Sequence, residues 1–253
     1  MFVVLSDVHA NREALAAVME EALRLNPERI ICLGDIVGYG PDPEWCVDAV
    51  RSSCEIVLCG NHDAAVVFGA KDFSDAAERT VNYHRQLLMP VEDDDRDVPQ
   101  ARWSFLKGLP QRHAENGMLF VHGAPRNPIN EYLRERDVQM KLERKFRENF
   151  DLIERLAFVG HTHHPGVITP ELRFLKPDDF ADVYHAEPAR KAIINVGSVG
   201  QPRNHDPRAV FVTVDGDEIR YHRVQYNVEK TATKIEQCGA IDPSIADRLR
   251  EGT

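Results

Sequence analysis

The sequence predicts an α/β fold in which a sheet is covered by helices. This prediction is based on two observations. Apolar runs of strand length recur along the chain, and most are continuous rather than alternating, as in strands buried on both faces. Amphipathic stretches separate the first three runs, which gives the alternation of strand and helix that is typical of this class. Because the chain has 253 residues, we expect a single domain over residues 1–253.

The main strands are expected at short apolar runs, which cover residues 2–5, 30–33, 56–58, 118–121, 157–159 and 193–196. A first helix is expected at residues 12–25, with Asn11 as its candidate N-cap. A second is expected at residues 43–50, where Pro43 suits the first helical turn. A third is expected at residues 73–89.

The remaining segments are more polar. The mainly acidic run at residues 92–97 is expected to form an exposed turn. Residues 131–156 form a charged, helix-compatible insertion, which we interpret as a solvated helix at one edge in preference to a lid. Short strands are expected at residues 166–169, 172–175, 192–196, 210–214 and 219–224, with a last helix at 243–250.

Composition excludes some classes of function. The net charge is −10, from 31 basic and 41 acidic residues, which argues against a nucleic-acid partner. The apolar runs are too short to span a membrane, so no membrane partner is expected. The five cysteines form no CxxC pair, and the chain begins without a leader-like segment. We therefore expect reduced thiols and a cytoplasmic protein.

Side chains of the metal-ligand type follow five of the expected strands. They are Asp7 and His9, Asp35, Asn61, His122, and His161 and His163. Because open α/β sheets bind ligands at the carboxyl ends of their strands, these side chains are expected to converge on one edge. Mixed nitrogen and oxygen ligands suit manganese, iron or zinc. Asp7 and His9 stand two residues apart, and so do His161 and His163. Both members of each pair can therefore face the same way from an extended segment.

Taken singly, each of these motifs is weak. Asp7-Val-His9 arises by chance, Gly34-Asp35 is typical of a turn, and a lone histidine is usually structural. Taken jointly, in this order and each after a strand, they predict a metal site. The other histidines are interpreted as structural: His84, His113, His164, His185, His205 and His222.

The motif order resembles the calcineurin-like metallophosphoesterase superfamily. The segments that carry the resemblance are Asp7-x-His9, Gly34-Asp35-x-x-Gly38, Gly60-Asn61-His62-Asp63, Val121-His122-Gly123 and Gly160-His161-x-His163. Residues 38–43 and 195–203 further resemble a bacterial subgroup labelled YfcE-like or diadenosine-tetraphosphatase-like phosphoesterases. The resemblance implies a four-layer α/β/β/α sandwich of the metallo-dependent phosphatase type, with a dinuclear metal site at the strand C-terminal ends.

The resemblance also implies roles for these residues. Asp7, His9, Asp35 and His163 would hold a first metal, and Asp35, Asn61, His122 and His161 a second. His62 would act as the catalytic residue, near the leaving-group oxygen as proton donor or electrostatic partner. A hydroxide bridging two divalent or trivalent ions would then attack a phosphodiester or phosphomonoester of a small or nucleotide-like molecule.

One departure from the family bears on the substrate. Protein phosphatases of the superfamily carry an Asp-Arg pair after the Gly-Asp motif, whereas Gly38-Tyr39 stands here. This argues against a protein phosphatase and against a symmetrical dinucleotide-tetraphosphate hydrolase. Arg12, Arg126 and Arg203 are therefore candidates for substrate binding. Two alternatives remain open: a non-catalytic scaffold of the same fold, and a nuclease.

Overall fold

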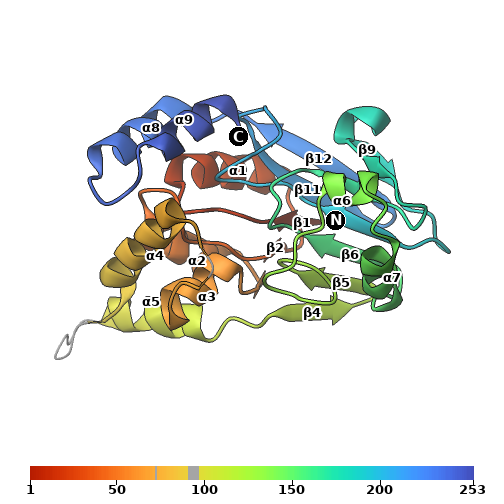
Figure 1. Ribbon diagram of the computed structural model, residues 1–253, viewed down its shortest axis with the longest axis horizontal. Helices are drawn as coiled ribbons and strands as arrows, with labels where there is room; N and C mark the ends of the chain where they lie inside the picture. Colours follow the sequence, from red (N-terminus) through yellow and green to blue (C-terminus); the bar gives the residue numbers. More distant parts are fainter. Residues whose placement is uncertain (72, 91–96) are drawn as a thin grey trace.

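The computed structural model describes residues 1–71, 73–90 and 97–253, and within these ranges the strands form two six-stranded sheets (Figure 1). The first sheet has the order β3 (Ile56–Val57), β2 (Ile30–Cys32), β1 (Phe2–Leu5), β11 (Ala209–Asp215), β12 (Glu218–Val224) and β9 (Val183–His185). The second has the order β4 (Arg112–Glu115), β5 (Met118–Val121), β6 (Leu156–Val159), β10 (Ala192–Asn195), β7 (Gly166–Ile168) and β8 (Phe174–Leu175).

Each sheet combines parallel and antiparallel strands: the first has a parallel half and an antiparallel half, and the second has a parallel centre with antiparallel flanks. β1, β2 and β3 are parallel, and β11 pairs antiparallel with β1, with Val3 opposite Thr213. In the second sheet β5, β6 and β10 are parallel, while β4 and β7 pair antiparallel at their sides. Parallel strands end at a common edge, so each sheet directs several strand ends to one place.

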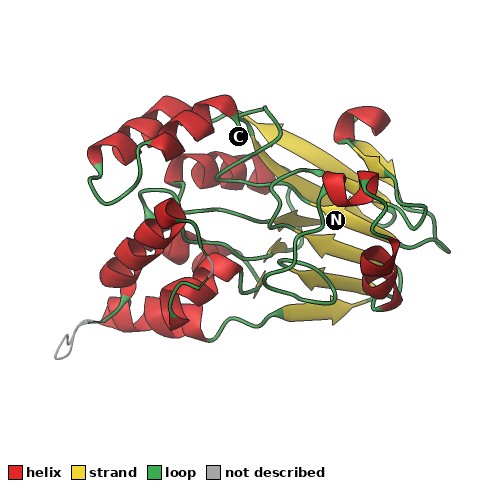
Figure 2. Ribbon diagram, viewed as in Figure 1, coloured by secondary structure: helices red, strands yellow, loops and turns green. Residues whose placement is uncertain are grey.

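Helices cover the outer faces of both sheets (Figure 2). The first sheet carries α1 (Arg12–Arg24), α2 (Pro43–Ser53), α3 (Asn61–Phe68), α4 (Asp75–Leu88), α5 (Asp97–Lys107), α8 (Val228–Gln237) and α9 (Ser244–Glu251) on its side of the molecule. The second sheet carries α6 (Glu135–Gln139) and α7 (Glu143–Asp151). A short 3₁₀ turn at Pro177–Phe180 precedes β9.

Alternate side chains of each strand supply separate cores, as the two-residue repeat of a strand requires. Val3 and Leu5 face the helices around α1, whereas Val4 faces the second sheet. Between the sheets, the rings of Phe120 and Phe158 stack with centroids 5.1 Å apart. The outer face of the second sheet packs on Phe146 and Phe150 of α7 and its neighbours. These layers confirm the predicted four-layer α/β/β/α sandwich.

Most predicted elements are confirmed within a residue or two. Asn11 caps α1 by accepting the Ala14 N–H at 3.1 Å, and Pro43 stands at the start of α2. The expected insertion at 131–156 differs, because α6 and α7 are separate helices with Lys141 in a left-handed conformation between them. The expected turn at 92–97 lies outside the described residues, apart from its last residue. The single-domain organisation stays a prediction.

Among the helices in the described ranges, none combines the length and the apolar character that a membrane crossing requires.

Candidate metal centre

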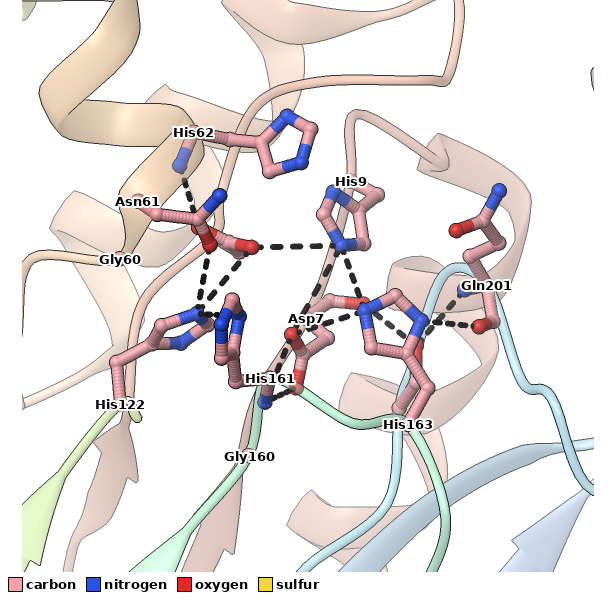
Figure 3. Close-up of polar contacts among 12 residues, drawn as sticks. Asp7, His9, Gly60, Asn61, His62, His122, Gly160, His161, His163 and Gln201 are labelled. Atoms are coloured by element: carbon pink, nitrogen blue, oxygen red, sulfur yellow. Dashed lines mark hydrogen bonds and ion pairs between the residues drawn. The ribbon is translucent and has the colours of Figure 1, made fainter. Parts of the chain in front are cut away.

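The side chains predicted as metal ligands lie together at one edge of the two sheets (Figure 3). β1 leads to Asp7 and His9, β2 to Asp35, β3 to Asn61, β5 to His122, and β6 to His161 and His163. Three groups have donor atoms within 4.8 Å of one another: Asp7, His9 and His163; His9, Asp35 and His62; and Asp35, His122 and His161. Because the two sets of parallel strands end side by side, residues 154 positions apart in the chain reach direct contact.

The first cluster is built on two histidines. The Nε2 atoms of His9 and His163 lie 3.1 Å apart, and the His163 Nε2 lies 3.2 Å from Asp7 Oδ1. Asp35 Oδ2 lies 3.6 Å from the His9 Nε2. Two donors that each lie about 2.1 Å from one cation are roughly 2.9–3.4 Å apart at angles between right-angled and tetrahedral. The closest contacts of the cluster fall in that range.

The tautomers of these rings leave lone pairs facing one another. The Nδ1 of His9 lies 3.0 Å from the Val37 carbonyl oxygen, and the Nδ1 of His163 lies 2.5 Å from the Gln201 carbonyl oxygen. A carbonyl only accepts, so each Nδ1 carries the proton and each Nε2 is bare. Two bare nitrogens therefore converge beside two carboxylate oxygens. A cation fits this arrangement, and without one it is repulsive.

The second cluster is centred on His122. Its Nε2 lies 3.3 Å from Asp35 Oδ2, 3.2 Å from Asn61 Oδ1 and 3.1 Å from His161 Nδ1. Asp35 thus contributes the same oxygen to both clusters, and its other oxygen accepts the His62 N–H at 2.8 Å. A shared carboxylate between two donor sets is the arrangement that a pair of cations requires.

Burial sets the charge states at this edge. Asp7, His9, Asp35, His122, His161 and His163 are all buried, with at most 3% of each exposed. Burial lowers the pKa of His9, His161 and His163 well below the usual value, so these rings are neutral and able to bind a cation. Burial opposes ionisation of Asp35, but neighbouring histidines hold its pKa well below the usual range. His122 differs, because Asp35 outweighs the effect of burial and raises the pKa of this ring to about 9. Three buried neutral imidazoles and an ionised carboxylate suit a transition metal.

The backbone is strained where these ligands stand. Asp7, His9, Asp35, His161 and His163 all have left-handed φ angles, between 48° and 63°. For a residue with a Cβ this conformation costs about 1–2 kcal/mol. Such strain persists only when the surrounding structure enforces it, and it concentrates at functional sites. The strand-to-loop turns are therefore shaped for the positions of these side chains and not for backbone stability.

Two glycines let the loops approach the carboxylates. A Cβ at Gly60 would collide with Asp35, and a Cβ at Gly160 would lie 2.5 Å from Asp7 Oδ2. The chain after Gly160 then donates the His161 N–H to both Asp7 oxygens, at 3.2 and 3.0 Å. Asp7 is thereby held by backbone on one side and faces His163 on the other.

His62 lies beside the clusters, buried and held by packing. Its ring centroid lies 4.9 Å from that of His9, 4.6 Å from that of Tyr39 and 4.9 Å from that of Phe73. Its Nδ1 is directed at the backbone of Gly38 and, within the described ranges, makes no hydrogen bond. Burial lowers its pKa to about 4. Aromatic neighbours therefore orient this ring.

Two buried side chains that the sequence analysis did not single out organise the loops. Asp63 accepts the N–H groups of Ile36 at 2.9 Å, Val37 at 3.3 Å and Gly60 at 3.0 Å, and so ties the Asp35 loop to the start of α3. Asn195, at the end of β10, donates to the Gly160 carbonyl at 2.8 Å. Both stand inside segments that carried the family resemblance, which was the available signal.

The three candidate arginines lie in different surroundings. Arg12 is exposed and stacks on Trp45 at 5.0 Å, and within the described ranges no hydrogen bond or salt bridge joins it to the clusters. Arg126 forms salt bridges with Glu131 and Glu148, which favours a structural role. Arg203 lies over the Tyr39 ring at 5.7 Å and forms no salt bridge with any carboxylate of the described ranges. The structure therefore brings only Arg203 close to the candidate site.

Comparisons with known proteins agree with this geometry. Residues 1–218 match the model of the calcineurin-like phosphoesterase superfamily domain. The protein MJ0912 of Methanocaldococcus jannaschii is 31% identical over 245 residues, which cover 93% of this chain and 91% of that protein. The crystal structure of a metallophosphoesterase from Sphaerobacter thermophilus aligns with a TM-score of 0.79 at 32% identity, over 100% of this chain and 98% of that one. The Pyrococcus horikoshii protein PH1004 aligns with a TM-score of 0.73 at 17% identity, over 100% and 99% of the two chains, and so shares the fold.

Proposed function

The chain belongs to the calcineurin-like phosphoesterase superfamily, and on this premise we propose that it is a metal-dependent hydrolase of a small or nucleotide-like phosphate ester. The observation that carries the proposal is the pair of bare Nε2 atoms of His9 and His163, which lie 3.1 Å apart among carboxylates. Asp7, His9, Asp35 and His163 would hold one ion. Asp35, Asn61, His122 and His161 would hold the other, and manganese, iron and zinc all suit these donors.

Two bound cations would supply positive charge that lowers the pKa of a water and neutralises the oxygens of a phosphate. The chain's own residues would then position the phosphate and protonate the leaving oxygen. His62 packs its Nδ1 against Gly38, so Nε2 is the ring nitrogen that would face the leaving oxygen and supply its proton. Arg203, which no carboxylate of the described ranges neutralises, would attract the phosphate.

Two alternatives carry less support. A scaffold of this fold has no need of a complete donor set, yet all seven predicted ligands and His62 are present. A nuclease is disfavoured by the net charge of −10, because an acidic surface repels a polyanion. We also propose a cytoplasmic location, since all five cysteines are free thiols.

Hydrolysis of bis-para-nitrophenyl phosphate by the manganese-loaded protein tests the proposal. We expect turnover that a chelator abolishes and manganese restores. An inert protein with its metal fully loaded would refute the proposal and favour the scaffold. Cleavage of duplex DNA ends that falls steeply with salt would favour the nuclease.

A further inference from the structure

A cavity of about 680 Å³ opens beside the candidate metal centre and extends away from it along α3. Asn61, His62 and His161 line its inner end, and Phe68, Phe73 and Ile129 line the remainder. A volume of this size is typical of pockets for small organic ligands. The cavity is far larger than a phosphate needs, so it has room for the group to which a phosphate is attached.

One face of α3 forms the floor of this cavity. Asn61, Ala64, Ala65 and Phe68 all line it, and they stand at positions i, i+3, i+4 and i+7 of the helix. The two alanines leave space in the middle of the floor. At 1.5 Å per residue, Asn61 and Phe68 are about 10 Å apart along the axis. The floor therefore has a polar donor at one end, a gap, and an aromatic ring at the other end.

Phe68 leaves 71% of its surface in water, the largest exposed fraction among the exposed large hydrophobic residues of the described ranges. Its neighbour in the cavity, Phe73, packs edge-on against His62 at 82°. The ring of Tyr132 is already covered, by His161 at 3.7 Å and by the guanidinium of Arg134 at 3.9 Å. Tyr39, which also lines the cavity, packs on His62 at 4.6 Å and lies under Arg203 at 5.7 Å. Phe68 is thus the most exposed aromatic ring of the lining, and it remains available for stacking.

We propose that this cavity binds the nucleoside part of a nucleotide ester, with its base stacked on Phe68 and its sugar over Ala64 and Ala65. The phosphate end of this arrangement rests on the proposed function, whereas the base end does not. A floor with a polar residue at one end, a gap and an aromatic ring at the other end fits a flat base that is joined to a phosphate through a polar sugar. Ser74 and Asn130 also line the cavity, and they are candidate hydrogen-bond partners for the edge of the base. A lipid chain would need continuous apolar walls, which the cavity lacks.

Binding of adenosine and of ribose to the chelator-treated protein tests the base end without any metal or turnover. We expect ligand-observed NMR to give an adenosine dissociation constant at least tenfold below that of ribose. Phe68→Ala should raise the adenosine constant about tenfold, because one stacked base is lost. Phe68→Trp should retain binding, and Ala64→Leu should block the gap. Leu23→Ala, at an exposed leucine of α1, is the matched control and should change nothing.

The same variants are then assayed with manganese and bis-para-nitrophenyl phosphate. We expect Phe68→Ala to raise KM with little change in kcat, since Phe68 lies away from the donor clusters. Equal binding of adenosine and ribose, or equal adenosine binding by Phe68→Ala and Leu23→Ala, would overturn the nucleoside site. Absence of manganese-dependent hydrolysis with adenosine binding intact would instead refute the proposed function alone.

Discussion

His84 gives the fold a measurable sensitivity to acid. This histidine of α4 is fully buried, its Nδ1 accepts the Gly38 N–H at 3.0 Å, and its Nε2 lies 2.9 Å from the Gly40 carbonyl oxygen. Both bonds form with a neutral ring that is protonated on Nε2. His84 therefore stabilises the turn that carries Tyr39. The ring of Tyr39 in turn packs on His62. Burial lowers its pKa to about 3.

The sign of the effect follows from the two pKa values. The unfolded chain has an ordinary histidine pKa of about 6.5, so it takes up the proton first as the pH falls. Stability from the neutral ring is therefore complete above pH 6.5 and is lost as the pH falls toward 3. Between pH 7.5 and pH 5.0 this proton uptake lowers the free energy of unfolding by about 2 kcal/mol.

Urea unfolding at these two pH values, on chelator-treated protein, measures this loss. We expect the free energy of unfolding of the wild type to fall by about 2 kcal/mol more than that of His84→Gln, because glutamine stays neutral. All other histidines are common to both proteins, so the comparison isolates His84. His185→Gln, at an exposed histidine of β9, should behave as the wild type. An equal loss in His84→Gln and wild type would refute the reasoning.

Three further predictions concern the site. His62→Ala should keep its metal content but lose 10²–10⁴-fold in kcat, roughly the contribution of a general acid, and loss of metal would contradict its role. Asp63→Asn places an amide among three N–H donors and should lower the free energy of unfolding in urea by about 2–3 kcal/mol, whereas Asp179→Asn, at an exposed turn, should cost under about 1 kcal/mol. Arg203→Gln should raise KM for bis-para-nitrophenyl phosphate, while Arg126→Gln should lower the thermal midpoint with kinetics unchanged; the opposite pattern would reverse their assignments.

The fold was predictable where local pattern and tertiary environment agree. Continuous apolar runs such as residues 2–5 are buried on both faces, and they form the parallel strands of the two sheets. Polar edge strands carry no such signal: β4 alternates exposed and half-buried residues, and β9 has two half-buried residues and one exposed residue. The start of α3 carries no helical signal either, because Gly60-Asn61 is typical of a turn. Asp63 caps it as a helix by accepting the Gly60 N–H.

The candidate site was predictable to a different extent. Its seven donor residues were predicted because each follows a strand, and the structure brings their side chains together, although their role as ligands stays a prediction. The carbonyls of Val37 and Gln201 that fix the histidine tautomers could not be predicted. Every residue has a carbonyl, so only tertiary structure selects these two. The stacking of Tyr132 on His161 could not be predicted either, because only the tertiary structure brings these two rings together.

We propose above all that the donors at this sheet edge hold two cations. Anomalous diffraction from crystals of manganese-supplemented protein tests this most directly. We expect two peaks per chain, one among Asp7, His9 and His163, the other among Asn61, His122 and His161, with Asp35 between them. A single peak, or none at this edge, would contradict it.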